Sequence, residues 1–77
     1  MIERVELFVE LLNENVLVWR PTSAFRLDGE LLVLSNENYD PETEEWAVVP
    51  GSLVRIKLMQ SSDGSIPVAV KHDEPQP

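Results

Sequence analysis

The sequence predicts a small all-β barrel of five to six short antiparallel strands. Apolar and β-branched runs recur at intervals of roughly ten residues, as in small barrels and sandwiches. Asn, Asp, Gly and Pro lie between the runs, where turns need them. The chain has 77 residues, which is enough for one domain with a thin core. We therefore expect one barrel over residues 1–71 and a flexible polar tail over residues 72–77.

Residues 2–12 fit either a helix or a strand. A helix leaves two leucines off its apolar stripe, whereas a strand leaves only Phe8 on its polar side. An Asn-rich turn at 13–15 and a second apolar run at 16–19 come next. Two such runs joined by three turn residues predict a hairpin, so the strand is favoured over the helix.

Further strand and turn signals follow along the chain. Pro21 has no amide hydrogen, so the second strand ends or bends there, or has its proline on an unpaired edge. The Asp-Gly pair at 28–29 predicts a hairpin. Residues 35–45 form the longest loop, and Pro67 should face an open strand edge. The chain resumes over residues 23–27 after Pro21, and the other expected strands cover residues 30–34, 46–49, 53–59 and 66–70.

Charge is the strongest compositional signal. Fourteen acidic and six basic residues give a net charge of −8. Five of the acids lie in the long loop, here called the acidic loop: Glu37, Asp40, Glu42, Glu44 and Glu45. Such a field repels phosphate backbones and anionic membranes, which disfavours nucleic-acid and membrane partners. The loop is either a solvated surface or a surface for a basic partner.

The composition also bears on location. No apolar run approaches the roughly 18 residues of a membrane span. Acidic residues interrupt the first apolar stretch, which departs from the pattern of a signal peptide. We therefore expect a cytoplasmic protein with no membrane partner.

The sequence predicts no catalytic, metal-binding or cofactor-binding residues. It has no cysteine, and His72 is the single histidine, so a nucleophile beside a base and a thiolate metal site both lack components. The acidic loop lacks the glycine that a calcium loop needs. Three isolated glycines serve turns and do not form a phosphate-binding loop. We expect a protein that is not an enzyme and has no cofactor.

The aromatic residues offer a candidate contact surface. If the first hairpin keeps Val16 and Val18 inward, Trp19 lies outside near Phe8, and such an apolar patch marks a partner or self-association surface. Trp and Arg are enriched in interface hot spots. Alternatively the two Trp side chains fill the thin core, and strand register decides between these readings. The candidate contact residues are Phe8, Trp19, Arg20, Pro21, Tyr39 and Trp46.

Two stretches resemble a known architecture. EEWAVVPGSLVRIKLM followed by DGSIPVAV resembles the second half of an SH3-like small barrel. LFVELL, VLVWRPTSAFRL and GELLVL resemble the first half of small uncharacterised bacterial proteins of this type. The resemblance covers about residues 5–71 and implies a binding module. The first strand, ELFVELL, lacks the tyrosines of the Ala-Leu-Tyr-Asp-Tyr run in eukaryotic SH3 domains, so a proline-rich peptide is not the expected ligand.

Three functions are compatible with this sequence. The leading expectation is a non-catalytic barrel that acts through protein–protein contact or self-association. The first alternative is an acidic inhibitor or decoy whose loop covers a basic site on a nucleic-acid enzyme, with fast and salt-dependent association. The second alternative is nucleic-acid binding, which requires one basic face. That face would hold Arg4, Arg20, Arg26, Arg55 and Lys57.

Overall fold

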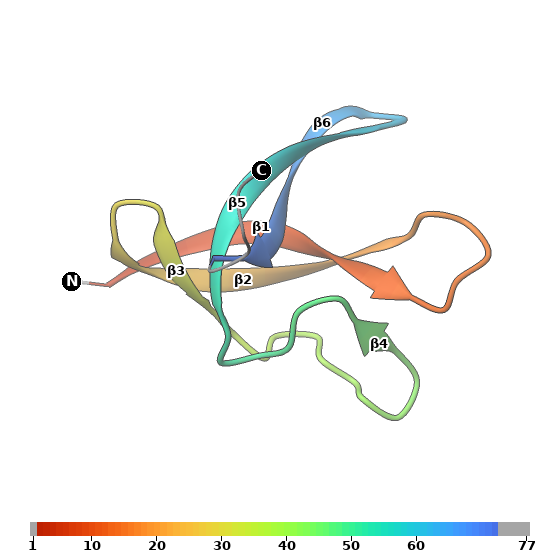
Figure 1. Ribbon diagram of the computed structural model, residues 1–77, viewed down its shortest axis with the longest axis horizontal. Helices are drawn as coiled ribbons and strands as arrows, with labels where there is room; N and C mark the ends of the chain where they lie inside the picture. Colours follow the sequence, from red (N-terminus) through yellow and green to blue (C-terminus); the bar gives the residue numbers. More distant parts are fainter. Residues whose placement is uncertain (1, 73–77) are drawn as a thin grey trace.

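In the computed structural model, which describes residues 2–72, the chain forms six β-strands and no helix within that range (Figure 1). The strands are β1 (Glu3–Leu12), β2 (Trp19–Asp28), β3 (Leu31–Leu34), β4 (Glu45–Trp46), β5 (Leu53–Ser61) and β6 (Gly64–Lys71). Strands β1, β2, β3, β5 and β6 pair in that order and close on β1, while β4 adds to β1. The predicted all-β barrel is confirmed.

One strand pair departs from the predicted antiparallel order. β1 and β6 are parallel, and they pair at Phe8 and Val68. The cause is the number of strands in the ring. When neighbours alternate in direction around a closed ring of five, the first and last strands must run the same way. The barrel therefore closes through one short parallel seam.

The loop of the first hairpin is longer than the sequence predicts. Within residues 2–12 a strand forms, as favoured, over Glu3–Leu12, but the expected strand at 16–19 is wrong in all but its last residue. The loop spans residues 13–18, and it begins at Asn13 with a left-handed φ of 64°. Val16 is 72% exposed because it lies beyond the end of the barrel, where no strand covers it.

Pro21 lies inside the continuous strand β2 and not at its end. It pairs with Phe8 of β1, and its carbonyl accepts a hydrogen bond from Asn38 Nδ2 at 2.9 Å. The second side of β2 at this point therefore faces a loop, because the pairing with β3 begins only at Ala24. The expectation of a proline on an unpaired strand edge is confirmed, since such an edge needs no amide hydrogen.

The second half of the chain follows the predicted order, with one strand shorter and two strands longer than expected. The expected strand at 46–49 is reduced to Glu45–Trp46, and the chain then turns so that Val48 is buried and Val49 is exposed. The amide of His72 donates to the carbonyl of Leu53 at 3.1 Å. The remainder of the expected tail, residues 73–77, lies outside the described residues.

The core holds one face of each barrel strand. In β1 the side chains alternate between the core and the outside, as a strand predicts. The buried residues of the whole core are Leu7, Val9, Leu11, Ala24, Leu32, Leu34, Trp46, Val48, Val54 and Ala69. Burying these side chains is the main stabilising contribution in so short a chain.

Candidate contact surface

An open groove lies between the β1–β2 hairpin and the β5–β6 hairpin. The two hairpins meet at the parallel seam and diverge beyond it (Figure 1). The groove has a volume of about 630 Å³. Its first wall comes from β1 and the loop before β2: Phe8, Leu17, Val18 and Trp19. Its second wall comes from the tip of the β5–β6 hairpin: Ile66 and the polar residues 60–63.

Strand register places Phe8 and Trp19 on the same outer face. Phe8 alternates along β1 with Leu7 and Val9, which are 1% and 0% exposed, so its side chain lies outside the barrel. The antiparallel pairs join Trp19 to Glu10, which shares the face of Phe8. Of the two readings left open by the sequence, the structure therefore has Trp19 outside the barrel wall and half-buried in the groove.

A buried apolar residue, Val68, lies on the outer face of the barrel near the groove. Val68 is 1% exposed although it is not part of the main core. It pairs with Phe8 at the seam, on the outer face of the barrel. Val68 lines a neighbouring hollow together with Met59 and Val70, so the apolar surface of the groove comes from its two walls alone.

Trp19 also has an unused hydrogen-bond donor. Its Nε1 atom is shielded from solvent and has no acceptor among residues 2–72. Buried Trp side chains usually find an acceptor for this N–H group, because a buried donor without one destabilises the fold. Trp19 therefore contributes apolar surface to the groove and keeps one buried donor without an acceptor in the described chain.

The remaining predicted contact residues do not join this surface. Trp46 is 3% exposed and belongs to the core, which corrects its placement on a contact surface. Its indole donates to Glu44 Oε1 at 3.2 Å, and the ring of Tyr39 packs edge-on against it at 4.9 Å between centroids. Arg20 Nε donates to Glu44 Oε2 at 2.9 Å. The rings of Tyr39 and Trp46 and the Arg20–Glu44 ion pair therefore form one cluster. Among the remaining predicted contact residues, only the exposed Pro21 lies beside Phe8.

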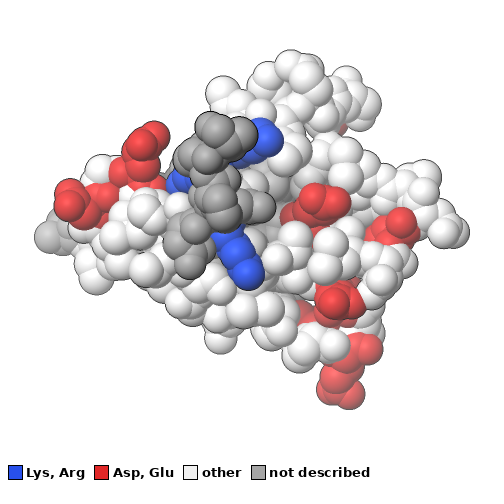
Figure 2. Space-filling model, viewed as in Figure 1, with Lys and Arg blue, Asp and Glu red and all other residues white. Residues whose placement is uncertain are grey.

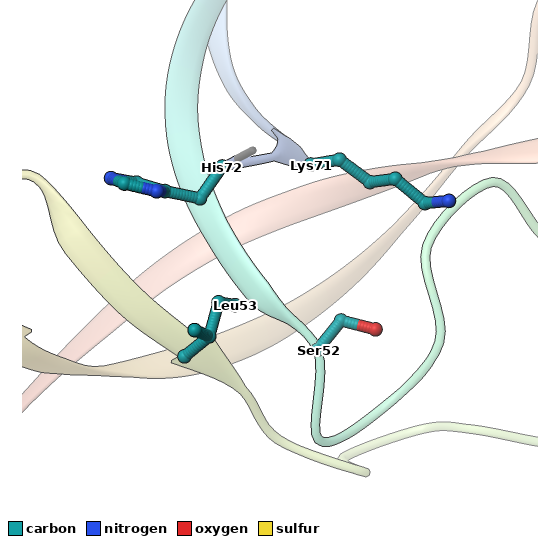
Figure 3. A pocket seen from close by; sticks show the side chains of 4 residues that line it. All are labelled: Ser52, Leu53, Lys71 and His72. Carbon is teal, nitrogen blue, oxygen red and sulfur yellow. The ribbon is translucent and has the colours of Figure 1, made fainter. Parts of the chain in front are cut away.

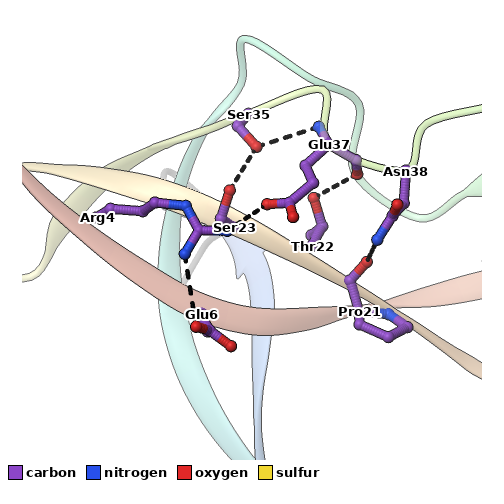
Figure 4. Close-up of polar contacts among 8 residues, drawn as sticks. All are labelled: Arg4, Glu6, Pro21, Thr22, Ser23, Ser35, Glu37 and Asn38. Atoms are coloured by element: carbon purple, nitrogen blue, oxygen red, sulfur yellow. Dashed lines mark hydrogen bonds and ion pairs between the residues drawn. The ribbon is translucent and has the colours of Figure 1, made fainter.

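The acidic loop is bound to the barrel at its first residue, Glu37. Its carboxylate pairs with Arg4 Nη2 at 2.6 Å, and its carbonyl accepts from Thr22 Oγ1 at 2.7 Å (Figure 4). The Ser23 and Ser35 hydroxyls share a hydrogen bond of 2.8 Å beside this pair. The Ser23 hydroxyl and the Arg4 guanidinium hold the pKa of Glu37 below its usual value.

The end of the acidic loop is held as well. Hydrogen bonds from Arg20 and from the Trp46 indole lower the pKa of Glu44. Asn13 donates to Glu45 across the hairpin loop. Within residues 2–72, the carboxylates of Asp40 and Glu42 form no ion pair. Three of the five carboxylates of the acidic loop, those of Glu37, Glu44 and Glu45, therefore make polar contacts within the molecule.

The basic residues are divided between two regions. Arg4, Arg20 and Arg26 each pair with a glutamate, the last with Glu3 at 2.8 Å. Arg55 and Lys57 lie in β5. The five cations do not form one unpaired basic face. The condition that we set for nucleic-acid binding is therefore not met.

Other surfaces offer little chemistry. A hollow of about 290 Å³ is lined by Ser52, Leu53, Lys71 and His72. Figure 3 shows the Lys71 and His72 side chains pointing in opposite directions, so they do not converge on one point. In the described part of the chain, no group of three or more His, Cys, Asp or Glu could hold a metal ion. That part also has no helix long and apolar enough to cross a membrane.

Comparisons of the chain with models of protein families, with curated proteins and with solved structures find no match. The small barrel is consistent with an SH3-like fold, while the family itself stays a prediction. Sequence reasoning missed three groove residues: Leu17, Val18 and Ile66. The apolar run 16–19 carried the signal for the first two, since a run of exposed apolar residues marks a contact surface.

Proposed function

We propose that this protein is a non-catalytic β-barrel module that binds a partner protein in the groove between its two hairpins. The observation that carries the proposal is the outward register of Trp19, which sets its indole on the same outer face as Phe8, in the wall of the groove. Trp is the residue type most enriched in interface hot spots. The occupant we infer is an apolar segment of another protein that packs against Phe8 and Trp19.

A different protein is favoured over a second copy as the occupant. The chain carries a net charge of −8, and like charge opposes association of identical molecules at low salt. Asp63 at the rim of the groove adds to this repulsion. Self-association is tested directly by sedimentation of the purified chain over a range of concentrations and salt.

The test uses the partner captured by the tagged protein from nuclease-treated lysate and then purified. Trp19→Ala should weaken binding by about 2 kcal/mol or more, measured by calorimetry. Leu27→Ala is the matched control, because Leu27 is 53% exposed and does not line the groove. Unchanged affinity together with a lowered melting temperature would place Trp19 in a structural role and reject the groove.

Salt separates this function from the acidic decoy. Contacts in an apolar groove persist at high salt, whereas an interface made by the acidic loop loses affinity and association rate. Binding to the purified partner at low and high salt therefore decides between them. Loss of binding at high salt with no effect of Trp19→Ala would favour the decoy.

A further inference from the structure

The edge of β5 that faces away from β6 is open over most of its length. β5 pairs with β3 through Leu53 and Val54 only, and within residues 2–72 no strand pairs with that edge from Arg55 to Ser61. In Figure 1 this part of the β5–β6 hairpin rises from the barrel as a two-stranded arm. An open edge of this kind presents unpaired N–H and C=O groups and is a template for another strand.

Backbone direction along β5 identifies the groups that are available. The carbonyl of Ser52 accepts from Leu34 on the β3 side, and the carbonyl of Leu53 accepts from His72 on the β6 side. Backbone groups alternate between the two edges of a strand, so even-numbered residues face the open edge. Three residues of the arm direct N–H and C=O groups to it: Ile56, Leu58 and Gln60.

The side chains at this edge divide into two different faces. Ile56 is half-buried against the core, and the next side chain on its face, Leu58, is 70% exposed. The opposite face carries Arg55 and Lys57. A strand added at the edge would therefore have an apolar neighbour on one face and a basic neighbour on the other.

The cations of the arm are unpaired within the described range. The basic residues that form no ion pair there are Arg55, Lys57 and Lys71. All three lie in the β5–β6 hairpin, whose single acidic residue is Asp63 at the turn. Arg55 Nε is also shielded from solvent without a hydrogen-bond acceptor among residues 2–72. Figure 2 shows basic side chains gathered over β5 and β6, with acidic side chains toward the two ends of the molecule.

We propose that the open edge of β5 is a second docking site, which adds an extended partner segment whose acidic and apolar side chains alternate. The backbone groups of the edge supply the hydrogen bonds of strand addition. The acidic side chains of the segment lie beside Arg55 and Lys57, and its apolar side chains cover Leu58. Neighbouring strands place side chains on matching faces, which is why the segment must alternate.

A second copy of the chain does not fit this edge. Two copies joined through β5 about a two-fold axis would bring Arg55 and Lys57 of both onto one shared face. Like charges on neighbouring strands are destabilising, and a Lys on an edge strand blocks such pairing. An acidic segment reverses the sign of this interaction. The β5 edge adjoins the groove at Gln60, which belongs to both, whereas Ile56 and Leu58 do not line the groove.

The test uses the full chain and a synthetic peptide of about ten residues in which Glu and Val alternate, the length of a typical long strand. Binding should slow hydrogen exchange at the amides of Ile56, Leu58 and Gln60, measured by NMR. A peptide of the same composition with its glutamates in one block should bind at least severalfold more weakly. Equal binding of both peptides, or displacement by oligothymidylate, would show a site for any polyanion and overturn the proposal.

Two variants test the charge and the backbone separately. Lys57→Glu should weaken peptide binding about fivefold. Lys71→Glu makes the same change in net charge away from the edge and should leave the affinity nearly unchanged. Leu58→Pro removes a donor from the open edge without breaking a bond to β6, and it should abolish binding. Leu58→Thr keeps that donor and should retain protection of the edge amides.

Several outcomes would reject this site while leaving the groove intact. Equal losses for Lys57→Glu and Lys71→Glu would mean that net charge alone attracts the peptide. A dimer that Leu58→Pro dissociates would mean that a second copy occupies the edge. Loss of peptide binding in Trp19→Ala would place the peptide in the groove. Melting curves for each variant show whether the fold is retained.

Discussion

At the scale of single residues, the two tryptophans have different environments. Trp46 lies in the short strand β4, where it pairs with Leu11 of β1, and it is buried with its indole donating to Glu44. Trp19 starts β2 opposite Glu10 and lies outside the barrel. Residue type is the same, so strand register alone decides which of them stabilises the core and which is available for contact.

This difference gives a paired prediction. Trp46→Phe should lower the free energy of unfolding by about 1–2 kcal/mol, because it leaves a small cavity and removes a donor from the buried Glu44 contact. Trp19→Phe should cost less, since its Nε1 has no acceptor in the described chain. Urea unfolding of both variants checks the order. A larger loss for Trp19→Phe would contradict the placement of the two rings.

A second residue-scale prediction concerns pH. The fold lowers the pKa of Glu37 and Glu44 from the ordinary value of 4.5. The folded chain therefore binds fewer protons there than the unfolded chain, and their contribution is present above pH 4.5 and is lost as pH falls through the lowered values. Replacing both residues by Gln should flatten the fall in melting temperature below pH 4.5.

Glu42→Gln is the matched control for this experiment. Its carboxylate forms no ion pair within residues 2–72, so the substitution should leave the pH dependence of melting unchanged. An effect equal to that of Glu37→Gln and Glu44→Gln would mean that net charge, and not the two ion pairs, sets the acid sensitivity.

At the scale of elements, the β5–β6 hairpin has a tight turn that only glycine fits well. Gly64 has a φ of 109°, in a region that side-chain-bearing residues rarely adopt. A Cβ atom there would meet no neighbour, so the strain lies in the backbone. Gly64→Ala should destabilise the hairpin by about 1 kcal/mol, seen as faster amide exchange in the arm. Ser62→Ala in the same turn should have little effect.

The sequence is informative about elements and much less so about their register. Alternation over residues 53–59 and the Asp-Gly turn identified strands that the structure contains. The start of β2 was misplaced, because the loop from Asn13 to Val18 contains an apolar run that local propensity assigns to a strand. The pairing of β6 with β1 at Phe8 could not be predicted from local sequence signals, because it joins distant parts of the chain.

In the candidate site, too, the sequence predicted the place of some residues and not of others. Phe8 and Trp19 were singled out from composition, and the structure brings them together. Tyr39 and Trp46 pack against each other instead, because the loop carries Glu44 back to Arg20 and closes over them. That contact depends on a long-range ion pair, which no local pattern records.

At the scale of the whole molecule, charge is unevenly used. Three arginines neutralise glutamates of β1 and of the acidic loop, while the cations of the β5–β6 hairpin stay unpaired in the described chain. A molecule with a net charge of −8 thus presents a basic arm. Electrostatic fields of opposite sign on one small protein orient an approaching partner before contact.

The seam between β1 and β6 also constrains the order of events during synthesis. Translation adds ~5–20 residues per second, so β1 waits several seconds on the ribosome for β6 to be made. During that time the nascent chain has Leu7 and Val9 without their final cover. Early hairpins form from local contacts, but closure needs contact between distant parts of the chain and is correspondingly slow. The apolar face of β1 is therefore accessible to a ribosome-associated chaperone until β6 has been made.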